Sequence, residues 1–321
     1  MNDSSVHKTK EHRLIESIKS WTGERLIGDD CAILPGRGLV TADSLVQGTH
    51  FLLPGISYED LGWKSIAVNL SDVAAMAGRP RFAIVSLTLP DDVSEADFEK
   101  LFGGMLDCAR SYRCRIVGGD LTRGPVLVVS ITVIGDEHES GVLRRSTALP
   151  GDVVVVTGDF GASAAGLWLL QKSIKRAQHC LNKHFRPLPR LCESWALVRQ
   201  TGGRGAMMDA SDGLADALIQ LASASQVGIT VQAEKIPLHP ETIEVSVEAD
   251  VEAMDWALYG GEDYELVACL SESDWQAISS SPTNPFTAIG QVTSQAGQIV
   301  LKTQKGEIQR IDLNRAFQHW K

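Results

Sequence analysis

The chain lacks the features that mark a membrane or secreted protein. No apolar stretch reaches 18 residues, the minimum for a membrane-spanning helix, anywhere in the 321 residues. The first twenty residues, MNDSSVHKTKEHRLIESIKS, are polar and contain no apolar core of a secretion signal. We therefore expect no membrane association and a cytoplasmic location.

Paired cysteines and excess positive charge are also missing. The six cysteines are scattered without a Cys-x-x-Cys pair, which favours reduced thiols over a disulfide framework or a zinc site. Lys and Arg number 30 against 40 Asp and Glu, for a formal net charge of −10. Because nucleic-acid-binding proteins usually carry a basic surface, we expect no nucleic-acid partner. The negative net charge does not exclude an anionic small-molecule ligand, provided that cations neutralise the binding site.

Several common catalytic motifs are absent as well. Lys64 and Ser65 form a Lys-Ser pair, but no upstream glycine has the spacing of a P-loop. There is no protein-kinase motif set, no Gly-x-Ser-x-Gly and no His-Glu-x-x-His. Glycines follow an apolar run at 158–166 without the dinucleotide-binding spacing, so we assign them to helix packing.

What the chain contains is an alternation of apolar β-rich and helical segments. Predicted strands lie at 38–45, 81–90, 115–117, 125–135, 152–158, 264–270, 286–292 and 298–303. Predicted helices lie at 59–78 and 96–112, from about 162, and at 211–225. Long β runs adjoin without helices between them, which predicts an α/β protein of α+β type with mixed sheets. Pro150 and Gly151 break the pattern, and we expect two domains, 1–137 and 138–321.

Aspartates recur beside Gly, Ser or Thr at places that resemble turns. They are Asp29, Asp30, Asp43, Asp72, Asp120, Asp209 and Asp212. A single such aspartate is usually a turn former or helix cap. A gathered set would repel one another and raise their pKa values unless cations were present. Carboxylate oxygens favour Mg²⁺, Mn²⁺ or Ca²⁺ over zinc, so the sequence predicts several ions and a polyphosphate ligand.

The stretch VGGDLTRG at 117–124 combines these features. Gly118 and Gly119 would let backbone N–H groups approach phosphate oxygens, and Asp120 would hold a bridging metal. Arg145 and Arg123 are the two candidates for a bidentate phosphate contact. Either arginine can equally be a solvated surface side chain.

Seven short motifs occur in an order that resembles the thiamine-monophosphate kinases, within the ATP-binding enzymes related to aminoimidazole ribonucleotide synthetase. They are IGDDCAIL, TADSLVQGTHF, KSIAVNLSDVAAMAG, VGGDLTRGP, RSTALPGD, MDASDGLADAL and LYGGEDYEL. The resemblance runs from about Leu14 to Phe317. It implies a two-domain fold whose N-terminal domain binds ATP and Mg²⁺ and pairs its sheet with that of a second subunit in a homodimer. The reaction it implies is phosphorylation of thiamine monophosphate by ATP to thiamine diphosphate.

The resemblance also assigns residues. The metal set it implies is Asp30, Thr41, Ala42, Asp43, Asp72, Asp120, Asp209 and Asp212. The ATP contacts it implies are Tyr112, Gly119, Asp120, Arg145 and Ser211, and the substrate contacts are His50, Glu262 and Phe317. Asp43, Asp120 and Arg145 would act by electrostatic positioning, with no covalent nucleophile. Ala42 could offer a metal only its carbonyl oxygen, and Trp320 is the alternative to Phe317.

Two other functions stay open at this point. The first is another ATP-dependent enzyme of the same group, such as a purine-pathway synthetase. The second is a nucleotide sensor without catalytic activity, which the full set of aspartates disfavours. Turnover of ATP with thiamine monophosphate would separate the three.

Overall fold

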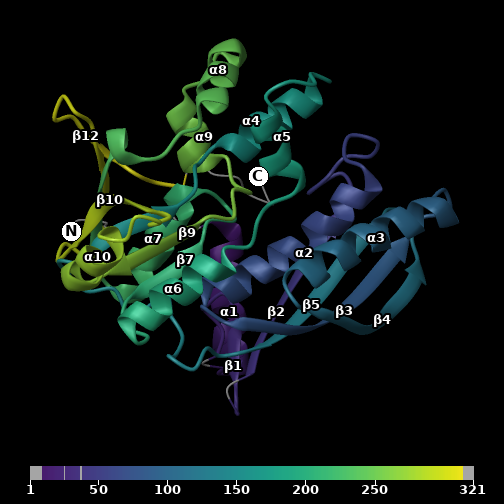
Figure 1. Cartoon of the computed structure of the whole chain (residues 1–321), viewed down its shortest axis with the longest axis horizontal. Helices are drawn as coiled ribbons and strands as arrows, with labels where there is room; N and C mark the ends of the chain where they lie inside the picture. The colour runs from purple at the N-terminus through teal and green to yellow at the C-terminus, as the bar shows by residue number, and fades with distance from the viewer. Residues whose placement is uncertain (1–8, 25, 37, 314–321) are drawn as a thin grey trace.

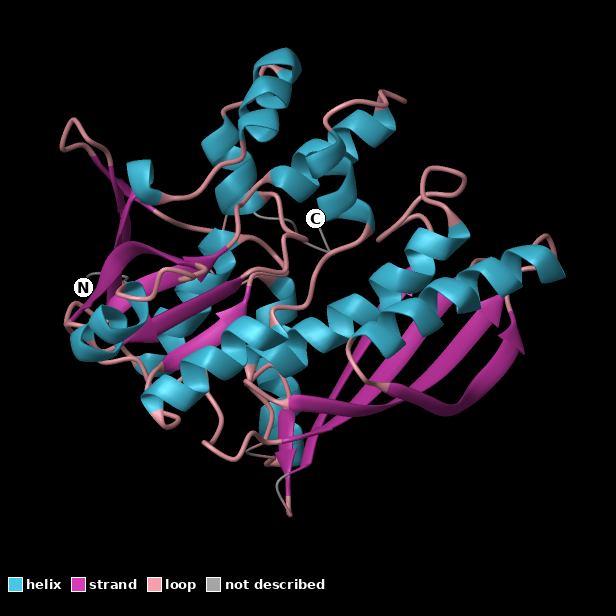
Figure 2. Cartoon of the chain, viewed as in Figure 1, coloured by secondary structure: helices cyan, strands magenta, loops and turns pink. Residues whose placement is uncertain are grey.

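The computed structural model describes residues 9–24, 26–36 and 38–313, which form two mixed sheets with helices packed on them (Figures 1 and 2). The strands of the first sheet lie within 32–136, and those of the second lie within 153–310. The predicted α/β class with mixed sheets is therefore confirmed. Within the described ranges, no helix has the length and apolar character to cross a membrane.

The first sheet has five strands. Their order is β1 (Ala32–Leu34), β2 (Gly38–Val46), β5 (Val128–Asp136), β3 (Arg79–Leu89) and β4 (Arg115–Arg123). Only the edge pair β3–β4 is parallel. Helices α2 (Tyr58–Ala75) and α3 (Glu95–Ser111) cover one face, and none of the helices in the described ranges covers the other (Figure 2). A Cβ on Gly62 or Gly104 would meet backbone of the opposite helix at 2.0 Å or 1.9 Å, so these glycines let α2 and α3 pack closely.

The second sheet has seven strands. Their order is β12 (Ile308–Arg310), β11 (Ile299–Lys302), β8 (Gly228–Gln232), β10 (Phe286–Thr293), β6 (Val153–Thr157), β9 (Leu266–Leu270) and β7 (Ala206–Asp209). Strands β6 and β9 are buried along their whole length, as expected for continuous apolar runs in the middle of a covered sheet.

Helices surround this second sheet. They are α4 (Ala162–Gln171), α5 (Gln178–Phe185), α6 (Leu191–Thr201), α7 (Leu214–Ser225), the 3₁₀ turn η1 (Ala233–Lys235), α8 (Pro240–Ala249), α9 (Ala253–Tyr259) and α10 (Glu272–Ser279). The N-terminal helix α1 (Lys10–Thr22) contributes side chains to a pocket that also includes Asp30 and Gln220. Helix α2 contacts both β2 and β7, so it joins the two sheets.

Three of the aspartates interpreted as turn-like lie within regular elements, and for Asp43 and Asp72 these are the strand and helix predicted at 38–45 and 59–78. Asp43 lies within strand β2, Asp72 lies within helix α2, and Asp120 lies within strand β4. The stretch 117–123 is an extended strand because it pairs in parallel with β3, and its glycines do not break that pairing. Asp30, Asp209 and Asp212 do lie at element ends, as predicted.

Candidate active site

Three carboxylates meet at helix α2, which contacts both sheets. Asp30 precedes β1, Asp72 lies on α2, and Asp209 ends β7. One oxygen from each lies within 4.8 Å of the others, close enough to hold a common cation. Residues from both halves of the chain are therefore needed to form this carboxylate cluster.

Neighbouring side chains fix each member of the carboxylate cluster. Arg145 donates to both oxygens of Asp30, from Nη2 at 2.7 Å and from Nε at 3.1 Å. The hydroxyl of Thr41 donates to Asp72, and that of Ser71 donates to Asp209.

Four carboxyl groups at this site have pKa values above the ordinary range, those of Asp43, Asp72, Asp209 and Asp212. Burial, followed by repulsion from Asp30, raises the pKa of Asp43 to about 6 and that of Asp209 to about 7. Burial and then the charges of Asp43, Asp209 and Asp30 raise the pKa of Asp72 as well. Burial and nearby acids, Asp216 first, raise the pKa of Asp212 to about 8. Arg145 balances only part of this charge, and the oxygen-only donor set fits a hard divalent cation such as Mg²⁺.

A polar cavity of about 520 Å³, here called the carboxylate pocket, opens beside the cluster. Most of the predicted metal and ATP residues line it. They are Asp30, Thr41, Ala42, Asp43, Asp72, Arg145, Ser211 and Asp212, joined by residues of α1 and α7.

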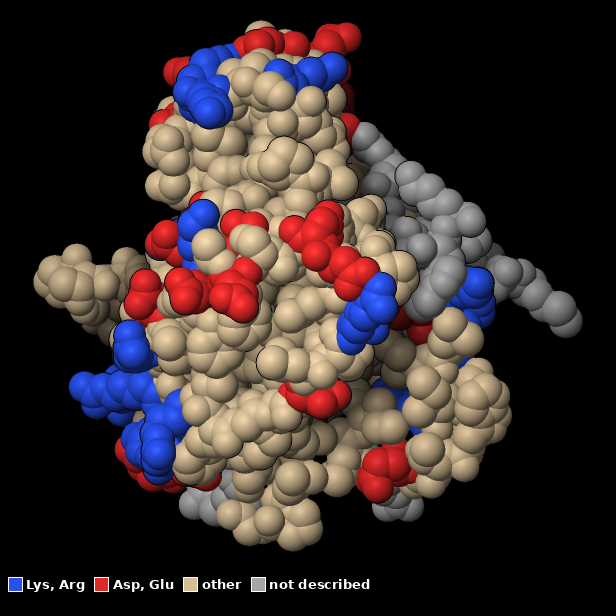
Figure 3. Space-filling view, turned by 90° about the vertical axis from the view of Figure 1, so that its right-hand side faces the viewer, with Lys and Arg blue, Asp and Glu red and all other residues tan. Residues whose placement is uncertain are grey.

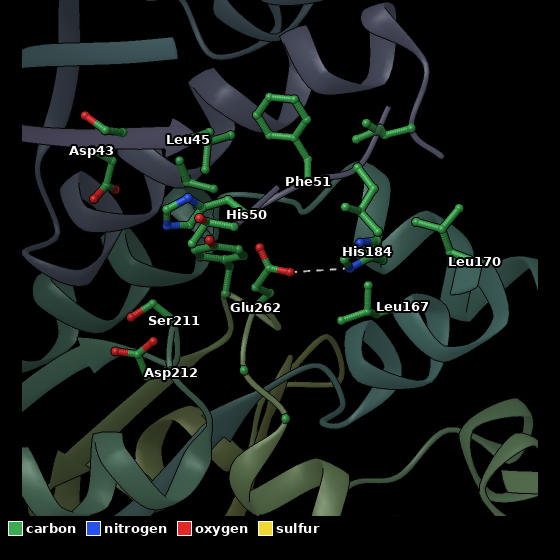
Figure 4. Close-up of a pocket in the computed structure, with 18 of the residues that line it drawn as sticks. Asp43, Leu45, His50, Phe51, Leu167, Leu170, His184, Ser211, Asp212 and Glu262 are labelled. Carbon is green, nitrogen blue, oxygen red and sulfur yellow. Dashed lines mark ion pairs between the residues drawn. The ribbon is translucent and has the colours of Figure 1, made fainter. Parts of the chain in front are cut away.

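A second cavity of about 470 Å³, here called the acceptor-side pocket, continues from the first. It shares Glu11, Asp43, Asp72, Ser211 and Asp212 with the carboxylate pocket. Its far end is apolar, with Phe51, Leu167 and Leu170, and His50 and Glu262 lie between the two ends (Figure 4). The two cavities therefore meet at the aspartates.

Glu262 is the one acid of the acceptor-side pocket whose pKa is lowered. Burial alone would raise it, but Lys64 and then His184 lower it. The Nζ atom of Lys64 lies 2.8 Å from Oε1 of Glu262, and Nδ1 of His184 lies 3.4 Å from Oε2.

Helix α2 supplies side chains to both pockets. Lys64, Val68 and Asp72 are spaced by four residues and therefore lie on one face of the helix. At about 1.5 Å per residue, Lys64 and Asp72 are separated by about 12 Å along the axis. The helix thus fixes the spacing between Glu262, which pairs with Lys64, and the carboxylate cluster.

Three predicted residues lie elsewhere within the chain. Gly119 and Asp120 are exposed on edge strand β4, and Tyr112 is half-buried at the end of α3. None of the three is among the residues lining either pocket. A Cβ on Gly119 would lie 1.7 Å from the carbonyl oxygen of Val85, so close strand packing requires this glycine.

The remaining predicted residues lie on the surface, in the acceptor-side pocket or outside the described residues. Arg123, the alternative to Arg145, pairs with Asp91 on the exposed surface. His50 lines the acceptor-side pocket, and its Nδ1 accepts a hydrogen bond from the backbone N–H of Val46 at 3.0 Å. Phe317 and Trp320 lie outside the described residues.

Sequence reasoning missed the residues that support the site. Lys64 and His184 contact Glu262, Ser71 donates to Asp209, and the side-chain oxygen of Asn69 accepts from the backbone N–H of Asp43 at 3.0 Å. The eight-residue spacing of Lys64 from Asp72, two steps of four, was the available signal, because it places a lysine on the same helix face as a predicted ligand.

Comparison with known proteins gives a consistent result. Residues 28–136 match the model of the N-terminal domain of AIR synthase related proteins, and residues 150–302 match that of the C-terminal domain. Thiamine-monophosphate kinase of Bacillus subtilis (strain 168) is 35% identical over 92% of this chain and 93% of its own length. The enzyme of that name from Escherichia coli (strain K12) is 39% identical over 84% of each chain. The solved structure of AaThiL complexed with AMPPCP and TMP is similar with a TM-score of 0.84 and 31% identity, covering 93% of this chain and 94% of that one.

Proposed function

Because the chain belongs to the thiamine-monophosphate kinase family of the AIR synthase related proteins, we propose that it transfers the γ-phosphate of ATP to thiamine monophosphate. One observation carries the proposal. A cavity lined by carboxylates and Arg145 joins a cavity with an apolar end, and the two share Asp43, Asp72, Ser211 and Asp212. Donor phosphates in the first cavity and an acceptor ring in the second would bring both phosphates to the shared aspartates.

Mg²⁺ would be held at the carboxylate end by the predicted aspartates of this chain. The central members are Asp30, Asp72 and Asp209, with Asp43, Asp212, Thr41 and the carbonyl of Ala42 around them. When bound, Mg²⁺ would supply the positive charge that screens the repulsion between two anionic substrates. Arg145 adds a fixed positive charge at the same place and keeps Asp30 oriented.

The transfer needs little acid–base chemistry from the protein. A phosphate monoester loses its second proton near pH 6, so the acceptor oxygen is already ionised at neutral pH. That oxygen forms a bond to the γ-phosphorus while the bond to the leaving oxygen of ADP breaks. The task of the chain is to hold the two groups in line, with Ser211 on the donor side and His50 and Glu262 on the acceptor side.

No covalent intermediate is part of this mechanism. Burial and the surrounding aspartates raise the pKa of the Cys31 thiol, the cysteine beside the carboxylate cluster, which leaves it unreactive. We assign His50 to acceptor binding. The six free cysteines favour a reducing compartment, and we place the reaction in the cytoplasm.

The position of Asp120, far from the carboxylate cluster, supports a homodimer. Asp120 on β4 pairs with Ser86 on β3, Ser86 pairs with Ser130 on β5, and Ser130 pairs with Ser44 on β2. Residues paired in this way have their side chains on the same face of the sheet, so Asp120 lies on the face opposite Asp43, the neighbour of Ser44. Three strand spacings, about 14 Å, separate the two aspartates. The outer sheet face exposes Phe82, Ile84 and Ile134. We propose that a second subunit covers this face, and that Tyr112, Gly119 and Asp120 complete the site of the partner. In this arrangement residues 1–137 bind ATP and Mg²⁺ and form the dimer, and residues 138–321 close the site.

The surface at the β4 end of the molecule carries charges of both signs. Figure 3 shows the β4 end of the molecule, where charged side chains form separate groups with uncharged surface between them. A continuous basic surface, as nucleic-acid binding requires, is not seen on this face.

The experiment that tests the proposal uses γ-labelled ATP. With thiamine monophosphate and Mg²⁺, the label should appear in thiamine diphosphate, and incubation with ATP alone should leave the protein unlabelled. Binding of ATP without turnover would favour the nucleotide sensor. Turnover only with a purine-pathway acceptor would favour the synthetase, and covalent label that chases into product would overturn direct transfer.

A further inference from the structure

Lys64 is a fully buried lysine that the transfer reaction does not use. Its side chain is 1% exposed, and its ammonium group lies 2.8 Å from Oε1 of Glu262. An isolated buried ammonium is strongly unfavourable, so this position is retained only because the carboxylate pairs with it. The partner is a pocket residue whose side chain is still 27% exposed.

His184 contacts the second oxygen of the same carboxylate. Its Nδ1 lies 3.4 Å from Oε2 of Glu262 and 3.2 Å from Oγ of Ser163. Burial and the charge of Lys64 lower the pKa of His184 to about 3, so its ring is neutral at physiological pH. Each oxygen of Glu262 thus lies close to one nitrogen, Nζ of Lys64 on α2 or Nδ1 of His184 on α5 (Figure 4 shows the His184 contact).

The backbone at Glu262 is also in an unusual conformation. Its φ is +59°, a region that favours glycine, and its N–H donates to the carbonyl of Ser211 at 2.6 Å. Glycine at this position would relieve the strain but remove the side chain. Strained non-glycine residues of this kind cluster at functional sites, where the side chain must point in one direction.

We propose that Lys64 and His184 are positioning residues that hold Glu262 as a fixed, ionised carboxylate in the acceptor-side pocket. This carboxylate selects an acceptor whose ring system carries positive charge or N–H donors. The inference rests on the proposed function, and the thiazolium and aminopyrimidine rings of thiamine monophosphate have this chemistry. Asp43 and Asp212 lie at one end of the pocket and Leu167 and Leu170 at the other (Figure 4), so the phosphate of the acceptor would point toward the aspartates and its rings toward the leucines.

The test is a double-mutant cycle on Lys64 and Glu262 in the full-length protein. Lys64→Met removes the charge and keeps the length of the side chain. We expect it to raise the KM for thiamine monophosphate about tenfold, with the KM for ATP and kcat changed less than about threefold. Glu262→Gln should raise the same KM by a similar factor. If Lys64 acts through Glu262, the double variant should resemble Glu262→Gln alone, because contacting residues are not additive.

A merely structural ion pair would give a different result. Lys64→Met would then lower the melting temperature and leave the KM for the acceptor unchanged, or the two substitutions would add. Lys183→Met is the matched control, because Lys183 is a buried lysine that pairs with Glu265 and does not line the pocket. An equal rise in acceptor KM in this control would overturn the assignment to Lys64.

A second variant and a binding measurement test the inference independently if Lys64→Met fails to fold. His184→Asn should weaken the binding of thiamine monophosphate severalfold in calorimetry without ATP, and should add little to Glu262→Gln. Unchanged binding in His184→Asn, or additive effects with Glu262→Gln, would contradict the inference. A wild-type protein that makes no thiamine diphosphate would instead contradict the proposed function, which separates the two failures.

Discussion

The two ends of the joined pockets handle negative charge in opposite ways. At one end, burial raises the pKa values of Asp43, Asp72 and Asp209, and Arg145 balances only part of their charge. At the other end, Lys64 lowers the pKa of Glu262 below its ordinary value. The carboxylate end thus needs a positive charge from outside the chain, whereas the acceptor end has its own. Under the proposed function, the carboxylate end would bind the cations and the other end would recognise the organic acceptor.

The largest expected effect is discrimination between thiamine monophosphate and free thiamine. Thiamine can occupy the acceptor-side pocket but has no phosphate to reach the carboxylate end. Its hydroxyl must also lose a proton, and we assign the nearest histidine, His50, to binding. We expect kcat/KM for thiamine to be lower by at least about 10³-fold, at about 1.4 kcal/mol per decade. Comparable values for the two acceptors would mean that a general base operates in this pocket.

Loss of a single carboxylate charge should have the next largest effect. Asp43→Asn and Asp120→Asn should each lower kcat on the order of 10²-fold or more, as removal of a preorganised electrostatic group does. Asp136→Asn is the control, because Asp136 is an exposed carboxylate that pairs with Arg81. Steady-state kinetics on the three variants should show near-normal turnover only in the control. Normal turnover in Asp43→Asn and Asp120→Asn would remove both residues from the metal set.

A mixing experiment tests whether Asp120 acts across a dimer interface. In a mixed dimer of Asp43→Asn and Asp120→Asn subunits, one site would carry both substitutions and the other neither. With random exchange, half of the dimers are mixed, so about a quarter of wild-type activity should return after co-refolding. Activity that stays at the level of the separate variants would place Asp43 and Asp120 in the same subunit's site, or exclude the dimer.

The sequence predicted the parts of this site that depend on local pattern. Asp30, Asp209 and Asp212 were recognisable because they flank apolar strands beside Gly or Ser. The mixed sheets were predictable because β runs followed one another without helices between them. Asp43 and Asp72 line the carboxylate pocket from a strand and a helix, not from the turns that their neighbours suggested, and their metal ligation stays a prediction.

The rest depended on tertiary contacts that no local pattern contains. Lys64 and Glu262 are far apart in the sequence, and their pairing follows from how α2 packs under the loop before β9. The extended path of 117–123 follows from pairing with β3, which overrides the turn tendency of Gly118 and Gly119. The position of Asp120 relative to Asp43 requires the sheet order, which was not predicted.

The smallest expected effect concerns the stability of the metal-free protein. Asp43, Asp209 and Asp212 have folded-state pKa values of about 6, 7 and 8, above the ordinary 3.8. The folded state therefore binds more protons than the unfolded chain, and stability falls as pH rises through these values. His184, with its lowered pKa, has the opposite effect only below about pH 6.5.

We therefore expect the melting temperature without metal to fall by a few degrees, roughly, between about pH 6.5 and pH 8.5. Asp209→Asn should reduce this slope, because it removes one of the groups that ionise in this range. Added Mg²⁺ should reduce the dependence of the melting temperature on pH in the wild-type protein. A melting temperature that rises over this interval would show that the carboxylates at this end are stabilised within the chain, as Glu262 is.

The most direct test of the account is the metal dependence of thiamine diphosphate formation. The protein is treated with a chelator, desalted, and assayed with ATP and thiamine monophosphate while Mg²⁺ is added back. The account predicts no product without the ion and full recovery on addition, with binding of thiamine monophosphate to the Lys64–Glu262 end measurable in both states. Undiminished product formation in the chelated protein would contradict it.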